Sequence, residues 1–302
     1  MEIRKYVLLC VLIGGMGQGV VLPKLPELLH ESTQIAFDSG LSATMMYLGI
    51  FLSTFQYGKI ADSGHVGKLL ASGLFAYAAT LILLAFTTAT FWIFCTRFAE
   101  GVSISAVYVA ADFVLGRVSK PGERGRWLSY YGVALSVGLM LGPTLVLLSP
   151  HLAAVFAMPI IASNLMRLPM LFVAGIAVVL AILALRYDVP KIYLDDAEKN
   201  PKLPANALAC GSAYGYMEAG LVAVFPVLAV TRFHVTTEYC LVVIILMAAL
   251  FSVLWGEAAD RFGARKIILI LLLLLAIGSA ILFGIAPFAN PAFLAYSLAV
   301  FM

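Results

Sequence analysis

Apolar residues along this chain are gathered into runs of about 20 residues, and most charged residues lie between the runs. A run of that length, wound as a helix, crosses the roughly 30 Å hydrocarbon core of a bilayer. The pattern therefore predicts an all-α membrane protein. It predicts nine spans, at 6–29, 41–58, 69–89, 91–115, 127–149, 168–186, 205–231, 240–256 and 267–287.

A tenth apolar run begins near Ala292 and stops at Met302. As a helix, this run would cover about half of a bilayer, so we expect the chain to end inside its tenth span. On this interpretation the sequence is a truncated copy of a longer protein, with about nine and a half spans present.

Composition and charge agree with a membrane protein. Hydrophobic residues make up 63% of the 302 residues and charged residues 12%, about half the charge of a typical soluble domain. The net charge of +3 is too small to indicate a nucleic-acid partner. Most of the 19 Lys and Arg residues fall in alternate connecting segments, starting with Arg4 and Lys5. This bias predicts a multi-pass protein of the cytoplasmic (inner) membrane with a cytoplasmic N-terminus.

Two related halves, joined by a charged linker, are predicted. Residues 188–204 contain three prolines and many charges, which is typical of a linker. Gly58 and Asp62 after the second span match Gly256 and Asp260 after the eighth, at an offset of 198 residues. We expect two pseudo-symmetric bundles: a six-helix bundle over 1–187, a cytoplasmic linker over 188–204 and an incomplete second bundle over 205–302.

The polar loop after the eighth span resembles a known signature. It runs from Gly256 through Asp260 and Arg261 to a basic pair, and it resembles the signature loop of the major facilitator superfamily, with Ala264 inserted. The glycine permits close helix approach, and the aspartate can cap a helix end or pair with a nearby base. The resemblance implies an inner gate built from Gly58, Asp62, Asp112, Arg124, Gly256, Asp260, Arg261, Gly263, Arg265 and Lys266.

The fourth span continues the resemblance. Arg97 and Gly101, followed by Asp112 near the inner end and by the turn Arg124-Gly125-Arg126, are similar to the fourth-helix pattern of the same superfamily. We expect Asp112 to anchor Arg124 or Arg126 at the inner surface.

The fifth and first spans resemble a narrower group. Gly138, Gly142 and Pro143 are similar to an antiporter motif, and the segment from Gly19 to Pro26 is similar to a pattern of drug–proton antiporters. Glycines at this spacing let helices pack closely, and the proline permits a bend. The resemblance implies a twelve-span, proton-coupled transporter that works by alternating access, most like the drug–proton antiporter group.

The charged residues that we place inside the bilayer, away from its surfaces, fall in the fourth and seventh spans, as Arg97, Glu100 and Glu218. Burying a charge in hydrocarbon is costly, so such residues indicate a solute or proton pathway. Under the repeat, Glu218 corresponds to Gln18 at equivalent depth, where a central site between the halves is expected. The predicted pathway residues are Gln18, Arg97, Glu100, Tyr108, Tyr214, Glu218 and Phe225.

Structural alternatives stay open for these residues. Arg97 and Glu100 are spaced i, i+3, so they can form a pair that only stabilises the fourth span. Glu218 can be a protonated structural residue bonded to a neighbouring helix.

Our leading hypothesis is a proton-coupled exporter of small amphiphilic or drug-like molecules, monomeric and driven by the proton gradient without a cofactor. The alternative is a proton symporter that imports a sugar, an organic acid or an amino acid. A non-transporting membrane sensor on the same scaffold is a third possibility. We do not expect an enzyme, because the sequence shows no metal-ligand spacing and no nucleophile–base pattern.

Overall fold

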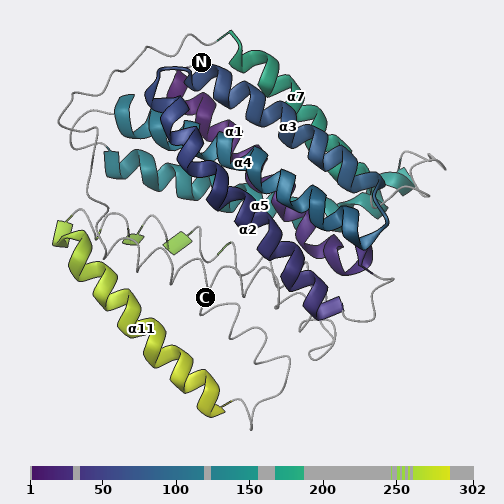
Figure 1. Cartoon of the computed structure of the whole chain (residues 1–302). Helices are drawn as coiled ribbons and strands as arrows, with labels where there is room; N and C mark the ends of the chain where they lie inside the picture. The colour runs from purple at the N-terminus through teal and green to yellow at the C-terminus, as the bar shows by residue number, and fades with distance from the viewer. Residues whose placement is uncertain are drawn as a thin grey trace.

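The computed structural model describes residues 2–29, 35–118, 124–155, 167–186 and 261–285, with isolated helical positions between 246 and 258. The regular elements of this part of the chain are all helices, shown in Figure 1. They are α1 (Ile3–Leu28), α2 (Ile35–Asp62), α3 (Val66–Phe86), α4 (Thr90–Val118), α5 (Arg124–Val155), α7 (Leu168–Ala184) and α11 (Ala264–Ile285).

Helices lie at each predicted span that falls on described residues, and five of these spans are confirmed, whereas membrane crossing by the helices over 41–58 and 267–287 stays a prediction. Five segments are long and apolar enough to cross a membrane: Ile3–Leu22, Val66–Phe86, Thr90–Arg117, Arg126–Ser149 and Arg167–Ala184. Several helices are longer than predicted, and α2 begins about two turns before residue 41. A helix satisfies its own backbone hydrogen bonds, so it continues through the interface after the apolar run has ended. The predicted span 205–231, most of 240–256 and the tenth run lie outside the described residues.

The first six of these helices pack against one another around α1 and α4 (Figure 1). The most extensive contacts join α1 to α5 and α2 to α4, and α3 packs against both α4 and α7. A buried apolar core fills the space between them, with Tyr6, Leu74, Tyr77, Ile104 and Met170 almost fully buried. α11 lies apart from this group in Figure 1.

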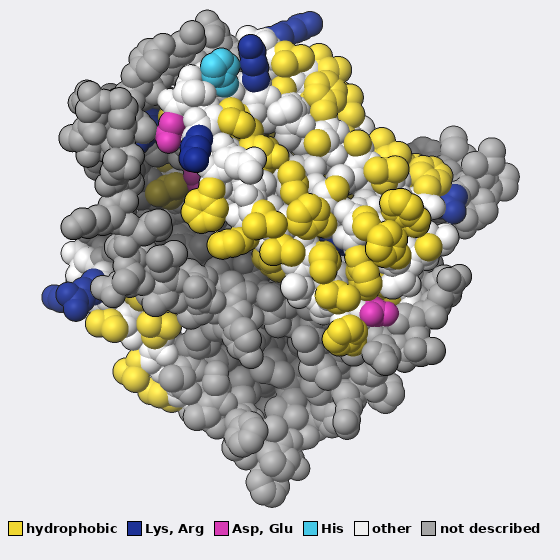
Figure 2. All heavy atoms as spheres, viewed as in Figure 1, with side chains coloured by type: hydrophobic (Ala, Val, Ile, Leu, Met, Phe, Trp, Pro, Cys, Tyr) yellow, Lys and Arg dark blue, Asp and Glu magenta, His cyan; other side chains and the backbone are white. Residues whose placement is uncertain are grey.

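The outer surface of the described helices is strongly apolar. Figure 2 shows a broad band of hydrophobic side chains across the visible face, with charged side chains at its margins. A soluble protein would not leave so large an apolar area in contact with water, whereas lipid chains cover it at no cost. The exposed residues include Phe51, Phe55, Leu83, Phe91, Trp92, Phe172 and Val179.

In each of the two predicted halves, a short turn contains a glycine with a left-handed backbone conformation. Gly64 has a φ of 83° just after α2, and Gly263 has a φ of 92° just before α11. A residue with a side chain is disfavoured in this region, so glycine allows the chain to reverse there. Gly263 belongs to the sequence motif, whereas the importance of Gly64 was not apparent from the sequence.

Candidate functional site

A buried ion pair lies on α4 inside the six-helix group. Arg97 Nη1 donates to Glu100 Oε2 at 2.6 Å, and both side chains are only 1% exposed. The i, i+3 spacing brings the two groups together on one helix, as the sequence predicted.

The ion pair leaves two buried polar atoms without a hydrogen-bond partner. These two atoms are Arg97 Nε and Glu100 Oε1. In the described part of the chain, the other buried side-chain polar atoms without a partner are the hydroxyls of Ser39 and Ser42. A buried polar group without a partner costs free energy, and native proteins keep few of them. The pair therefore retains unused capacity for a proton, a water molecule or a polar cargo group.

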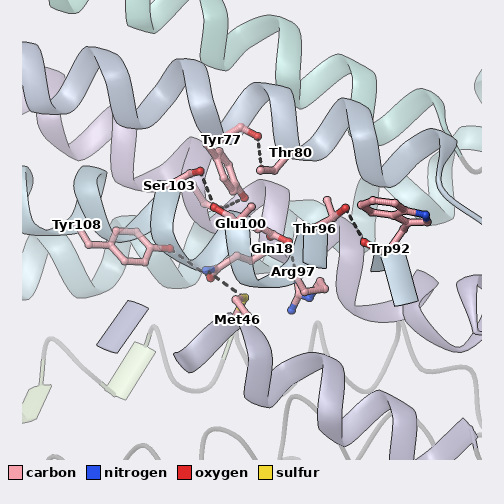
Figure 3. Close-up of polar contacts among 12 residues, drawn as sticks. Gln18, Met46, Tyr77, Thr80, Trp92, Thr96, Arg97, Glu100, Ser103 and Tyr108 are labelled. Atoms are coloured by element: carbon pink, nitrogen blue, oxygen red, sulfur yellow. Dashed lines mark hydrogen bonds and ion pairs between the residues drawn. The ribbon is translucent and has the colours of Figure 1, made fainter. Parts of the chain in front are cut away.

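Gln18 of α1 joins this region to neighbouring helices (Figure 3). Tyr108 of α4 donates its hydroxyl hydrogen to Gln18 Oε1 at 3.2 Å, and Gln18 Nε2 faces the Met46 sulfur of α2 at 4.0 Å. The Tyr108 ring also meets Tyr131 of α5 edge to face, with centroids 6.2 Å apart. Gln18 and Tyr108 are half-buried, unlike the ion pair. Four helices thus meet around one amide and two phenol groups.

Glycines on α1 and α5 bring these two helices together. A Cβ on Gly142 would lie 2.6 Å from Gly19 Cα, and one on Gly138 would lie 2.9 Å from the Met16 amide nitrogen. In the other direction, a Cβ on Gly15 would lie 2.6 Å from the Leu135 carbonyl oxygen. All three distances to backbone atoms are too short for any side chain at these positions. The close packing expected of these glycines is present, and Pro143 is buried beside them.

The first predicted gating loop shows fewer contacts than expected. A Cβ on Gly58 would meet no atom within 4 Å, so no close helix approach requires this glycine among the described residues. The Asp62 side chain makes no hydrogen bond or ion pair with another residue of the described ranges. Asp112 is exposed, and no ion pair joins it to Arg126 among the described side chains. The side chain of Arg124 lies outside that set, so its predicted contact with Asp112 stays a prediction.

The remaining predicted site residues divide into two groups. Arg261, Gly263, Arg265 and Lys266 are exposed at the start of α11. Outside the described residues lie Tyr214, Glu218, Phe225, Gly256 and Asp260.

The sequence did not point to Tyr77, which is buried completely. Its hydroxyl donates to the Gly14 carbonyl oxygen at 2.8 Å, bridging α3 and α1. A Cβ on Gly17 would lie 2.9 Å from Tyr77 Cζ, so glycine is required there as well. The cluster of glycines from Gly14 to Gly19 could have indicated a close contact at this part of α1. A helix with so many small residues usually packs tightly against its neighbours.

A family comparison decides what kind of protein this is. The sequence model described as Major Facilitator Superfamily matches residues 7–302. The chain belongs to the major facilitator superfamily. It is therefore a multi-pass membrane transporter and not an enzyme.

Relatives within the superfamily are distant. The chain is 25% identical over 280 residues to the uncharacterized MFS-type transporter YfkF of Bacillus subtilis. The aligned region covers 88% of this chain and 68% of that protein. It is 28% identical over 142 residues to the class B tetracycline resistance protein of Escherichia coli. This aligned region covers 46% of this chain and 35% of that protein. The chain thus spans about a third of the length of that second relative.

Solved structures agree on the fold. A bacterial homolog of the human lysosomal transporter Spinster, in an inward-facing and occupied conformation, superposes with a TM-score of 0.69 at 15% identity. The match covers 99% of this chain and 72% of that chain. At such low identity the likeness shows the all-helical membrane fold of the superfamily and nothing about cargo.

Proposed function

We propose that this protein is a proton-coupled secondary transporter that exports a small amphiphilic or drug-like molecule across the cytoplasmic membrane. It works by alternating access between two halves, 1–187 and 205–302, joined by the cytoplasmic linker 188–204. The N-terminus lies in the cytoplasm, as the distribution of Lys and Arg favours.

The Arg97–Glu100 pair carries this proposal. Both groups are 1% exposed and 2.6 Å apart, yet Glu100 Oε1 has no hydrogen-bond partner among the described residues. A purely structural pair would use both carboxylate oxygens, because an unpaired one destabilises the fold. We assign proton uptake and release during transport to Glu100, whose Oε1 can accept the proton.

Gln18 and Tyr108 supply the cargo contacts in this scheme. They are half-buried, they are hydrogen-bonded to each other, and they lie beside the aromatic ring of Tyr131. An aromatic surface with one amide group suits a flat or amphiphilic cargo better than a polyhydroxylated one. Tyr214, Glu218 and Phe225 complete the pathway from the second half, with Glu218 as a second proton-carrying group.

The antiporter-like helix and the loops have mechanical roles in the proposal. Gly138, Gly142 and Pro143 let α5 slide and bend against α1 as the halves move. Asp112 and Arg124, with the two loops that contain Gly58 and Gly256, hold the inner gate closed.

Relatives support export as the direction. Tetracycline resistance proteins of classes B, G and H match this chain at 28–29% identity over about half of its length. Resistance to a drug is consistent with its removal from the cell, and the aromatic surroundings of Gln18 suit a drug-like cargo.

A vesicle assay tests the proposal. The purified protein is reconstituted in liposomes with an imposed pH gradient, and uptake of tetracycline and of the cationic dye ethidium is followed. Wild-type protein should concentrate at least one of them against its gradient, whereas Glu100→Gln should allow only downhill movement. Glu2→Gln is the matched control, because Glu2 is an exposed acid at the N-terminus that pairs with Arg4. Full proton-driven accumulation by Glu100→Gln would remove Glu100 from the mechanism.

A second candidate keeps the fold and reverses the direction. The chain is 27% identical over 131 residues to a facilitated glucose transporter of Xenopus laevis, which covers 43% of this chain. Import of a sugar, an organic acid or an amino acid with protons is therefore the alternative. Inside-out vesicles separate the two candidates by the sign of cargo-driven proton movement: an exporter takes up cargo as protons leave, and an importer releases both together.

A further inference from the structure

Two buried serines on α2 direct their hydroxyl groups away from their own helix. A serine inside a helix normally donates to a carbonyl oxygen one turn earlier, as Ser53 of α2 does to Gly49 at 2.7 Å. Ser39 and Ser42 do not form this bond. They are 1% and 0% exposed, and neither hydroxyl has a hydrogen-bond partner among the described residues. Both side chains therefore present unused hydroxyl groups to the space beside α2.

Contacts between α2 and α4 fix the register of the two helices. The Met46 carbonyl carbon lies 2.8 Å from the Cβ position of Gly101. One turn further along both helices, the Ile50 carbonyl oxygen accepts a hydrogen bond from Ser105 at 3.4 Å. The same offset holds at both contacts, so α2 and α4 run in the same direction and stay in register over this stretch.

This register places the serines beside the ion pair. Ser42 is one turn before Met46, and Arg97 is one turn before Gly101, so Ser42 and Arg97 lie at the same level. Ser39 lies almost one turn nearer the start of α2. Positions 39, 42, 46, 49 and 53 are all buried and form one face of α2, the face that meets α4. Figure 3 shows the Arg97 side chain on the same side of α4 as Met46.

The unpartnered polar atoms form one chemical set. In the described part of the chain, the buried side-chain atoms without a hydrogen-bond partner are Ser39 Oγ, Ser42 Oγ, Arg97 Nε and Glu100 Oε1. Arg97 Nε can only donate, an ionised carboxylate can only accept, and a serine hydroxyl does both. The carboxylate disfavours an anion and the guanidinium disfavours a cation. The set therefore suits a neutral molecule that both donates and accepts hydrogen bonds.

The short distance between the two backbones limits the size of that molecule. One turn deeper, a Cβ on Gly49 of α2 would lie 3.0 Å from the Val102 amide nitrogen of α4. Helices in such close contact leave no room for a drug-sized cargo, which needs a pocket of several hundred cubic ångströms. A water molecule needs about two to four polar partners and little space. Water is therefore the ligand that fits.

We propose that Ser39 and Ser42, with Arg97 and Glu100, form a water site through which protons reach Glu100 from the outer side of the membrane. α2 begins at Ile35, so Ser39 lies about one turn from the outer end of the helix. This inference rests on the proposed proton coupling and on the proposed orientation, and it names the outer route of the proton.

Proton transfer along this site is balanced. One proton from outside binds to the outermost oxygen, and each water or serine oxygen then binds one proton as it releases another to the next oxygen. The last proton binds Glu100 Oε1, which becomes neutral. Arg97 Nε holds a water oxygen by donating to it and transfers no proton, because a guanidinium group stays charged.

Radiolytic footprinting tests for the water in lipid nanodiscs without any cargo. An X-ray pulse converts water to hydroxyl radicals, which oxidise methionines next to bound water even where bulk solvent has no access. Met46 is 3% exposed and lies one turn from Ser42, whereas Met170 is 1% exposed and lies in the apolar core. Met46 should be oxidised several times faster than Met170. The double variant Ser39→Ala with Ser42→Ala should lower the Met46 rate to that of Met170.

Two footprinting results would overturn the inference. One is equal oxidation of Met46 and Met170 in the wild-type protein, and the other is a fast Met46 rate that the double variant does not change. Ser53→Ala is the matched control, because Ser53 is buried on the same face of α2 and its hydroxyl is already bonded within the helix. It should leave the Met46 rate unchanged.

A second pair of variants keeps the test open if the double variant does not fold. Ser42→Thr keeps a hydroxyl, and Ser42→Val has nearly the same shape without one. Ser42→Thr should keep the wild-type oxidation of Met46, and Ser42→Val should lose it. Wild-type oxidation in Ser42→Val overturns the inference equally.

Transport in vesicles tests whether this water carries protons. With tetracycline or ethidium, whichever the wild-type protein accumulates, the double variant should show proton-driven accumulation about 10-fold slower or more. Exchange of labelled for unlabelled cargo at equal pH moves no net proton, so its rate should not change. Ser53→Ala should keep both rates. An equal loss of both rates in the double variant would give the serines only a structural role and overturn the inference.

The two proposals fail in different ways. Footprinting that depends on the serines, in a protein that accumulates no cargo with protons, would reject the proposed function and leave the water site established. Proton-driven accumulation by the double variant at the wild-type rate would reject the inference alone.

Discussion

The ideal Cβ position of Gly101 on α4 overlaps the carbonyl group of Met46 on α2, with the carbonyl carbon only 2.8 Å away. The relationship is reciprocal, because a Cβ on Gly49 of α2 would lie 3.0 Å from the amide nitrogen of Val102 on α4. The two backbones therefore touch directly at Met46, whose side chain faces Gln18, and one residue from Glu100.

Gly101→Ala should disrupt the contact between α2 and α4. Backbone cannot move aside as a flexible side chain can, so we expect a loss of about 1–3 kcal/mol or more and greatly reduced transport. Gly116→Ala on the same helix is the control, since a Cβ there would meet no atom within 4 Å. It should be neutral or slightly stabilising, because alanine favours a helix. Thermal unfolding in detergent compares the two; equal midpoints would contradict the observed packing.

The Arg97–Glu100 pair should behave as a coupled unit. Replacing either partner with leucine leaves the other charge buried and unpaired, which costs about 3–5 kcal/mol. The double variant Arg97→Leu with Glu100→Leu should recover most of that loss while remaining unable to couple transport to protons. A thermal double-mutant cycle gives the interaction energy. Additive losses would mean that the two side chains do not depend on each other.

Gly142→Ala should separate α1 from α5. Its Cβ would overlap the backbone of Gly19 and Val20, so α5 has to move away by a few tenths of an ångström or more. We expect transport to fall at least 10-fold while the protein still inserts in the membrane, with a lower unfolding midpoint. Gly132→Ala on the same helix meets nothing within 4 Å and should transport normally. Initial rates in vesicles, normalised to the amount of inserted protein, provide the measurement.

Substitutions of Gly64 and Gly263 should destabilise the protein in an order that is set by the backbone conformation at these positions. With φ values of 83° and 92°, both positions disfavour any L residue. Asparagine tolerates this region best, so Asn should be less harmful than Ala, and Val should be worst, at a cost of about 1–3 kcal/mol. Unfolding midpoints of the Asn, Ala and Val variants at each position test the order. A Val variant as stable as the Asn variant would show that the turn had rearranged.

Tyr108→Phe should weaken cargo binding without stopping transport. The variant keeps the ring that meets Tyr131 but removes the hydroxyl that donates to Gln18 at 3.2 Å. Loss of one such bond changes an affinity about 2- to 10-fold. We expect KM to rise by that factor with the maximal rate little changed. A fall in the maximal rate at constant KM would place Tyr108 in the conformational cycle instead.

Features that depend on the local pattern of residues could be predicted from the sequence. The spans followed from apolar run length, and the Arg97–Glu100 contact followed from spacing on one helix. Tyr77 could not be found this way, because its role depends on how α3 is rotated against α1, and its own span is uniformly apolar. Gly58 is a different case: the motif suggested a close helix approach, and none of the described neighbours lies within 4 Å of its Cβ position, so that role stays a prediction.

Packing between α1 and α5 also bears on how the protein is made. α1 makes its most extensive contact with α5, and Gly19 meets Leu139, so the two partners are 120 residues apart in the chain. At a synthesis rate of about 5–20 residues per second, α1 waits roughly 6–24 s in the bilayer before α5 emerges. During that interval its glycine-rich surface and the Gln18 amide have no permanent cover. Early folding of this transporter is therefore a period in which the nascent chain depends on the insertion machinery or on lipid for protection.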